Sequence, residues 1–584
     1  MTTVRAAGIG RIACAASLLA IIAIYVLRND SWIYSPVGWL DAWYYVGFGY
    51  EYPKPHFEEW NYKVSRLPWV LAQYSVRSAF DPLPAQYVLQ ITSLLGSVLF
   101  FFFAFRRLLG EVPALIGAAF LATLTYFHAS GGADYHDQMA GPLYAASFYC
   151  LTVAAERDRS DPLALAYGVL IGTTIHSNIL YINLVPLVSL HYFATRRQHG
   201  HTLSFKEFRR FTYVGLAGVL AITLVLGGIN AAFGRDFLFF VDQFSLATAF
   251  VIDNSQQSAW WKPWSSGWYL GNASIGPLAA GLVASLLVML AVTRIRLTPA
   301  RRLQVMSLSG QYFFMIVLWT AWQSLGQTAL QPDYFAYPLW FPLAGVIATA
   351  VGLREYRFSL RELAALSAIT LIAYGFPFFA YDSLIGARNY LPQGAFFYTA
   401  SLYSVAFLGC LALVVLANRR TAVYIAVVLL GLTNTLGARN PDKYRTNFCT
   451  DARDAELAIV SVHRRLAAYD PEFSGRIFIV FDVNDPSSVS TCANSPARDF
   501  GFSLTSTGFK YLDHPWPERP IRALELERLR SLIPRDPIIV LVSKRREAVT
   551  ELQERFTEAG KTINIVEEIH VAEGVISVPI FVLK

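Results

Sequence analysis

Acidic residues and a histidine stand beside apolar stretches of the chain, where a charged group is costly. Asp41 lies in VGWLDAWYYVGFGYEY, and Asp134, His136 and Asp137 lie in GGADYHDQMAGP. A carboxylate at the edge of a bilayer must be solvated, paired or bound to a cation, which makes it a candidate for function. We predict that Asp41, Asp134 and Asp137 are catalytic. Carboxylates from separate loops could deprotonate a hydroxyl or hold a divalent cation, with Asp41, Asp134 and His136 as its ligands.

Each of these residues also has a purely structural interpretation. Asp41 could cap a helix that begins at Ala42, and capping does not exclude a catalytic role. Asp137 could cap the helix that follows it, which would leave Asp134 as the freer group. A lone histidine at the end of an apolar segment, such as His136 or His176, is more often a satisfied interfacial residue than a ligand.

The elements that must position these residues are long apolar segments. Hydrophobic residues make up 54% of the chain and charged residues 15%, whereas soluble proteins carry about 25% charged residues. Inside a bilayer an apolar segment must be helical, because no water is present to satisfy its backbone groups. We predict roughly thirteen spanning helices at 7–27, 84–105, 112–130, 138–155, 162–177, 179–195, 211–233, 270–293, 305–325, 334–352, 362–380, 397–417 and 421–437.

Basic residues between the spans predict the orientation. Within residues 1–437, the linkers that would be cytoplasmic carry most of the Lys and Arg residues, such as Arg106 and Arg107, whereas the short external loops carry only Arg235, Lys262 and Arg388. Lys and Arg are retained on the cytoplasmic side during insertion, so the N-terminus should be inside. An odd number of spans then places the tail outside. The net charge of +7 therefore reflects topology, and we expect no nucleic-acid partner.

These patterns divide the chain into a helical membrane module, residues 1–437, and an extracytoplasmic α/β domain, residues 438–584. The external loops of the module are 28–83, 131–138, 234–269 and 381–396, and the aromatic residues of 28–83 and 234–269 predict short helices along the membrane surface. In the tail, DAELAIVSVHRRLAAY and REAVTELQERFTEAG have helical periodicity, and RIFIVFD, PIIVLVS, TINIVEEIHV and VISVPIFVLK have strand patterns.

Short motifs add a resemblance to a known family. Asp41 is followed by Tyr44, NYKVSRLPWVL supplies Arg66-Leu67-Pro68, and QPDYFAYPLWFPLAG contains Tyr334 and Tyr337. With these motifs, its many spans and the acidic segment after its third span, the chain resembles the GT-C superfamily of lipid-carrier-dependent glycosyltransferases. The similarity is to the bacterial branch related to protein mannosyltransferases and aminoarabinose transferases. It covers the whole chain in topology and only short stretches in residues.

The sequence departs from the family pattern at two places. Relatives often have Asp-Glu at the first acidic site, whereas Ala42 follows Asp41 here. A role that the glutamate has in relatives therefore has no counterpart in this chain. The Lys-Pro-Pro that often precedes the arginine is reduced to Lys54-Pro55.

The resemblance implies transfer of a hexose or pentose from a polyprenyl phosphate or diphosphate to an acceptor hydroxyl. The reaction would take place at the periplasmic face of the bacterial inner membrane, among its lipids, with a lipid, glycan or protein as acceptor. Asp41 would be the general base, and Arg66 and Arg388 would stabilise the phosphate leaving group. The other substrate-binding residues that we predict are Tyr44, His136, Lys262, Tyr334 and Tyr337.

Purely structural interpretations of these residues, and other functions of the protein, remain open at this point. Arg66 and Arg388 could instead contact lipid headgroups or nearby acids, and Tyr334 and Tyr337 could belong to an interfacial aromatic belt. A transporter or lipid flippase would place ionisable residues near mid-membrane and often shows two related halves, but the acids here lie at span ends. A membrane scaffold whose function lies in the tail would tolerate the loss of Asp41.

Overall fold

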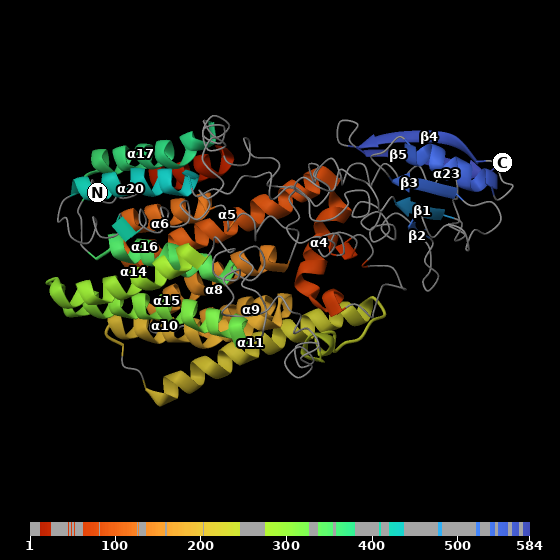
Figure 1. Cartoon of the computed structure of the whole chain (residues 1–584). Helices are drawn as coiled ribbons and strands as arrows, with labels where there is room; N and C mark the ends of the chain where they lie inside the picture. Colours follow the sequence, from red (N-terminus) through yellow and green to blue (C-terminus); the bar gives the residue numbers. More distant parts are fainter. Residues whose placement is uncertain are drawn as a thin grey trace.

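The fold is described from a computed structural model of the whole chain (Figure 1). The structure describes residues 12–24, 45, 48, 49, 52, 62–80, 82–124, 127, 136–157, 161–201, 204–245, 275–325, 337–353, 358–379, 408, 409, 420–436, 477–481, 521–525, 538–542, 547–558, 563–571 and 576–583.

Most of the described residues belong to long helices that run side by side (Figure 1). They are Ile12–Ile24, α5 (Pro82–Leu109), α6 (Glu111–Thr123), α8 (His136–Ala155), α9 (Asp161–Ser177), α10 (Leu184–Gln198), α11 (Phe205–Ala232), α14 (Ile275–Arg294), α15 (Pro299–Leu325), α16 (Tyr337–Val351), α17 (Leu360–Phe379) and α20 (Arg420–Leu436). Each overlaps a predicted span. Only residues 408 and 409 of the predicted span 397–417 are described.

Several boundaries differ from the prediction. Residues Ile179–Asn183 form the 3-10 helix η2, so the α-helical part of the predicted span 179–195 begins only at Leu184. Helix α8 begins at His136, inside the predicted loop 131–138. Asp137 is therefore the second residue of the helix rather than its cap. The first external loop contains the short helices η1 (Tyr62–Ser65) and α4 (Leu67–Ala79), and α4 crosses one end of the bundle (Figure 1).

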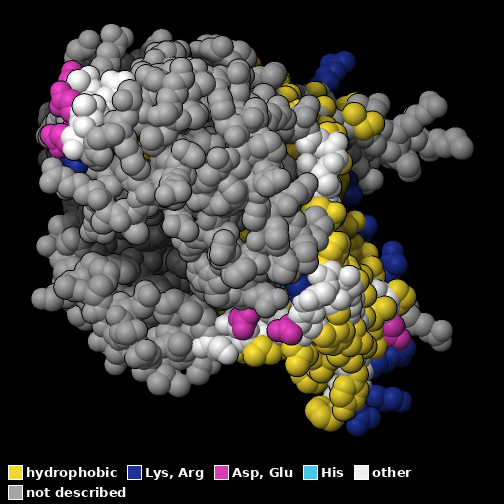
Figure 2. Space-filling model, turned by 90° about the vertical axis from the view of Figure 1, so that its right-hand side faces the viewer, with side chains coloured by type: hydrophobic (Ala, Val, Ile, Leu, Met, Phe, Trp, Pro, Cys, Tyr) yellow, Lys and Arg dark blue, Asp and Glu magenta, His cyan; other side chains and the backbone are white. Residues whose placement is uncertain are grey.

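Two of the described helical segments, Pro84–Leu109 and Phe205–Ala232, are long and apolar enough to cross a membrane by themselves. Helix α11 also exposes large apolar side chains at helical spacing, among them Leu216, Leu220 and Leu224. Exposed apolar surface of this extent marks contact with lipid or with another protein. From the end where the C-terminus lies, the described hydrophobic side chains form a band down one flank of the molecule (Figure 2).

Close packing of α9 against α11 depends on glycine. A Cβ on Gly168 would lie 2.0 Å from the carbonyl oxygen of Gly215, and one on Gly218 would lie 2.3 Å from that of Leu165. Small residues let helix backbones approach in a membrane, where association depends on van der Waals packing. These glycines therefore set the distance between α9 and α11.

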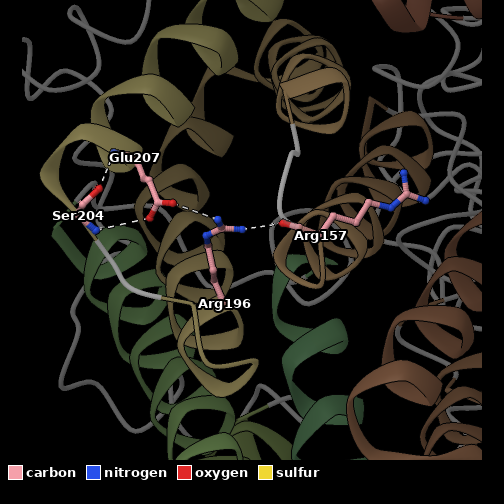
Figure 3. Close-up of polar contacts among 4 residues, drawn as sticks. All are labelled: Arg157, Arg196, Ser204 and Glu207. Atoms are coloured by element: carbon pink, nitrogen blue, oxygen red, sulfur yellow. Dashed lines mark hydrogen bonds and ion pairs between the residues drawn. The ribbon is translucent and has the colours of Figure 1, made fainter.

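Polar contacts join the helix ends whose linkers we predict to be cytoplasmic. Arg196 on α10 bonds Glu207 on α11 at 3.2 Å and the carbonyl oxygen of Arg157 at 2.8 Å. Glu207 also completes a capping box with Ser204, the N-cap of α11 (Figure 3). Further ion pairs join Arg107 to Glu156, Arg210 to Asp161 and Arg420 to Glu362. Linkers assigned to one side by their charge thus meet at one end of the bundle.

Arg301, at the start of α15, binds two other linkers at that end. Its guanidinium donates to the carbonyl oxygens of Leu108 and Leu109, at the end of α5, and to that of Gly352, after α16. Such bonds satisfy carbonyl groups that a helix leaves without partners at its C-terminus.

The tail contributes a mixed five-stranded sheet of order β2-β1-β3-β5-β4. Strand β1 (Ile477–Phe481) pairs in parallel with β2 (Ile521–Glu525) and β3 (Ile538–Val542), and β5 (Ile576–Leu583) pairs antiparallel with β3 and β4 (Ile563–Val571). Helix α23 (Glu547–Glu558) buries Leu552 and Phe556, one helical turn apart. Strand β2 had no counterpart in the sequence analysis. In Figure 1 the sheet and the C-terminus lie at the end of the bundle opposite the N-terminus.

Candidate active site

Arg66 is held at the start of α4 by a contact with the preceding part of the first external loop. It occupies the N-cap position of α4, and Pro68 in the first turn fits there because that position needs no backbone N–H. The Arg66 side chain is buried, with 9% of its surface exposed, and its Nη1 donates to the Tyr45 hydroxyl at 2.6 Å. The Arg-Leu-Pro motif is therefore joined to the segment that carries Asp41 and Tyr44.

The same two segments also approach each other at Gly49. A Cβ there would lie 2.6 Å from the Cβ of Gln73 on α4, so only glycine allows this approach. Tyr45, Phe48 and Tyr52 then form one apolar cluster with Leu67 and Trp69 of α4. Arg66 donates its hydrogen bond to Tyr45, a member of this cluster, so the packing of the cluster helps to hold Arg66 in place.

Gln243, in the second external loop, fixes the backbone just before Arg66. Its side-chain amide donates to the carbonyl oxygen of Ser65 at 2.7 Å and to that of His176 at 3.2 Å. His176 is the penultimate residue of α9 and shares a hydrogen bond of 2.7 Å with Thr223 of α11. Gln243 is buried. Segments from both long external loops and from the C-terminal end of α9 therefore meet next to Arg66.

A second connection between the external loops is centred on Tyr52. Its hydroxyl donates to Asn230 Oδ1 at 3.0 Å, and the Arg235 guanidinium lies 4.3 Å from the centre of its ring and donates to its carbonyl oxygen. Burial raises the pKa of Tyr52 to about 12, while the charge of Arg235 opposes that shift. Tyr52 therefore stays protonated at neutral pH and keeps its bond to Asn230. Arg235, which we counted among the few external cations, is thus part of the scaffold.

Buried polar side chains continue inward from this end along α4, α5 and α8. Arg77 of α4 donates to the amide oxygens of Gln73 and Gln86. Buried polar residues of α5 follow at helical spacing, at Gln86, Gln90, Ser93 and Ser97. The Ser93 hydroxyl donates to the carbonyl oxygen of Gln138 in the first turn of α8 at 2.5 Å. A line of buried polar side chains therefore runs from α4 along α5 to the first turn of α8.

The structure describes the predicted site only in part. Arg66 is buried beside Tyr45, as described above. His136 and Asp137 begin α8, and Tyr337 begins α16, with only their backbones described. The other predicted site residues lie outside the described residues: Asp41, Tyr44, Asp134, Lys262, Tyr334 and Arg388. Within the described ranges no three His, Cys, Asp or Glu residues cluster as metal ligands, and two of the predicted ligands lie outside those ranges.

Sequence reasoning missed Tyr45, Gln138 and Gln243. Tyr45 neighbours the predicted Tyr44 and could have been weighed with it. Gln243 bonds a residue that is 178 positions away in the chain, which no local pattern indicates. The burial of Gln138 was equally hidden, because it depends on how α8 packs against α5.

Comparisons with known proteins identify one matching family. Residues 75–227 match the family model of dolichyl-phosphate-mannose-protein mannosyltransferases, a segment that runs from within α4 into α11. It contains Asp134, His136, Asp137 and Gln138, whereas Asp41 and Arg66 precede it. No protein with a curated description matches the chain.

Solved structures that resemble the chain include two of one bacterial protein. They are ArnT from Cupriavidus metallidurans bound to undecaprenyl phosphate, with a TM-score of 0.48, and the same protein in the apo state, with a TM-score of 0.46. In both comparisons the sequence identity is 15%, and the alignment covers 96% of this chain and 97% of the other. The family match over residues 75–227 confirms the predicted resemblance to protein mannosyltransferases for that segment of the chain.

Proposed function

We propose that this protein is a multi-pass membrane glycosyltransferase that moves a sugar from a polyprenyl phosphate or diphosphate to an acceptor hydroxyl. The observation that carries the proposal is the match of residues 75–227 to a family named for transfer from a dolichyl-phosphate-linked sugar. The segment includes the start of α8, with the predicted acids Asp134 and Asp137. The reaction takes place at the periplasmic end of the bundle.

The arrangement of the first external loop supports this placement. The Arg66–Tyr45 hydrogen bond brings a buried cation to the segment in which Asp41 lies four residues before Tyr45. A phosphate leaving group gathers negative charge, which a fixed guanidinium stabilises well because it donates from a planar fork. In this proposal Asp41 removes the proton from the acceptor hydroxyl, the hydroxyl oxygen attacks the anomeric carbon, and the carrier phosphate leaves with the bonding electrons.

The test uses the full-length protein in liposomes with a panel of lipid-linked sugars. Undecaprenyl phosphates carrying a hexose, an N-acetylhexosamine or a pentose are supplied, with membrane extract as the source of acceptor. We expect labelled sugar to reach the acceptor from at least one of them, with release of the carrier phosphate. Transfer from a nucleotide sugar, or from none of these lipids, would contradict the proposal.

A further inference from the structure

We propose that Gln138 binds a hydroxyl group of the donor sugar, an inference that rests on the proposed function. Gln138 is the third residue of α8, and only 1% of its surface is exposed. Among the described residues, neither its amide nitrogen nor its amide oxygen has a hydrogen-bond partner. An unpaired buried polar group destabilises a folded protein, so in a native structure it needs an explanation, such as a functional role or a bound water or ion.

Nearby glutamines show that this end of the bundle otherwise pairs its amides. Gln73 and Gln86 are also fully buried, and both accept a hydrogen bond from Arg77. The backbone of Gln138 is fixed as well, because its carbonyl oxygen accepts a bond from Ser93 of α5. The unpaired groups are therefore confined to the side-chain amide, on a turn whose backbone is held in place.

The position of Gln138 favours the donor over a distant ligand. Its chain neighbour Met139 packs against the cluster that contains Tyr45 and Trp69, which also supports Arg66. The predicted acids Asp134 and Asp137 flank it in sequence. A lipid phosphate near Arg66 would bring its attached sugar to this part of the bundle.

The chemistry of the amide selects the sugar rather than the phosphate. A glutamine side chain both donates and accepts hydrogen bonds, whereas an ionised phosphate only accepts. Sugar hydroxyls do both, so one or two of them can satisfy the two unpaired atoms together. Gln138 thereby acts as a binding residue for the sugar, and Arg66 as one for the phosphate.

The test compares two lipids on Gln138→Leu and Gln138→Met, which remove the amide and keep an apolar side chain of similar size. The probes are undecaprenyl phosphate and the same lipid carrying the sugar that the unsubstituted protein transfers. We expect both variants to bind the sugar-bearing lipid about tenfold more weakly, as for the loss of about one hydrogen bond. Binding of undecaprenyl phosphate without sugar should not change.

Thermal stability provides a second readout, which a merely structural role would move in the opposite direction. Removing an unpaired amide should leave the melting temperature of the Gln138 variants equal or higher, whereas the control Gln86→Leu should lower it because Gln86 accepts from Arg77. Equal weakening for both lipids, or no weakening, would overturn the assignment. If the unsubstituted protein binds and transfers from no sugar-bearing lipid, the proposed function itself fails first.

Discussion

Tyr45 controls the direction of the Arg66 guanidinium through a hydrogen bond of 2.6 Å. The change Tyr45→Phe removes that acceptor and keeps the ring, which packs edge-on against Phe48. Bonds to charged groups contribute about 1.5–3 kcal/mol, so we expect kcat/KM for the lipid donor to fall at least about tenfold. Steady-state transfer in liposomes measures this. The exposed Tyr213 of α11 serves as the control: Tyr213→Phe should transfer normally, and equal rates for Tyr45→Phe would contradict a role for this contact.

Gln243 fixes the same arginine from the backbone side. In Gln243→Leu the carbonyl oxygens of Ser65 and His176 lose their amide donor, so the start of α4 is held less firmly. We expect the KM for the lipid donor to rise severalfold, because Arg66 meets the phosphate less often in its bound geometry. A change in kcat alone, with KM unmoved, would show that Gln243 does not position Arg66.

Only some of the residues around Arg66 could be predicted from the sequence. Arg66 was named from the Arg-Leu-Pro motif of the family that the chain resembles, and the structure places it buried beside Tyr45, while its role in binding phosphate stays a prediction. Tyr44 was named from the family resemblance and lies outside the described residues, whereas the contact of Tyr45 with Arg66 joins residues 21 positions apart and depends on tertiary packing. The contacts of Gln243 depend on the tertiary arrangement of both external loops, so they lay beyond any local pattern.

At the scale of elements, the spacing between α9 and α11 depends on glycine. The change Gly168→Ala would place a methyl group 2.0 Å from the carbonyl oxygen of Gly215, so the helices must separate. Overpacking of this kind costs about 1–3 kcal/mol, and we expect a lower melting temperature in detergent. Gly228→Ala on α11 is the matched control, since its Cβ would meet no atom within 4 Å. Equal melting temperatures for the two variants would contradict this packing.

Helix positions were largely predictable and helix ends were not. Long apolar stretches must be helical in a bilayer, so hydropathy located α5, α11 and the other described spans. The start of α8 at His136 and the 3-10 turn η2 depend on local packing, which hydropathy does not report. The short, partly polar helix α4 could be predicted only in general terms, as one of the surface helices of the first loop.

At the scale of the whole molecule, charge predicts orientation. The linkers joined by Arg196 and Arg301 meet at one end of the bundle, and the sheet lies at the other (Figure 1). Because basic linkers stay in the cytoplasm, the C-terminus should be periplasmic. Alkaline phosphatase fused after Lys584 should therefore be active, and green fluorescent protein fused there should be dark. Bright fluorescence with an inactive phosphatase would reverse the topology and place the candidate site on the wrong side.

The central claim is that a carboxylate at the periplasmic end of the bundle activates the acceptor of a lipid-borne sugar. The most direct measurement is transfer from the sugar-bearing undecaprenyl phosphate by Asp41→Asn in liposomes. The exposed Asp236 provides the control Asp236→Asn. A general base contributes about 10² to 10⁴ in rate, so we predict a loss of at least about a hundredfold for Asp41→Asn, with unchanged binding of undecaprenyl phosphate. Folded Asp41→Asn protein that transfers sugar as fast as the control would contradict the account.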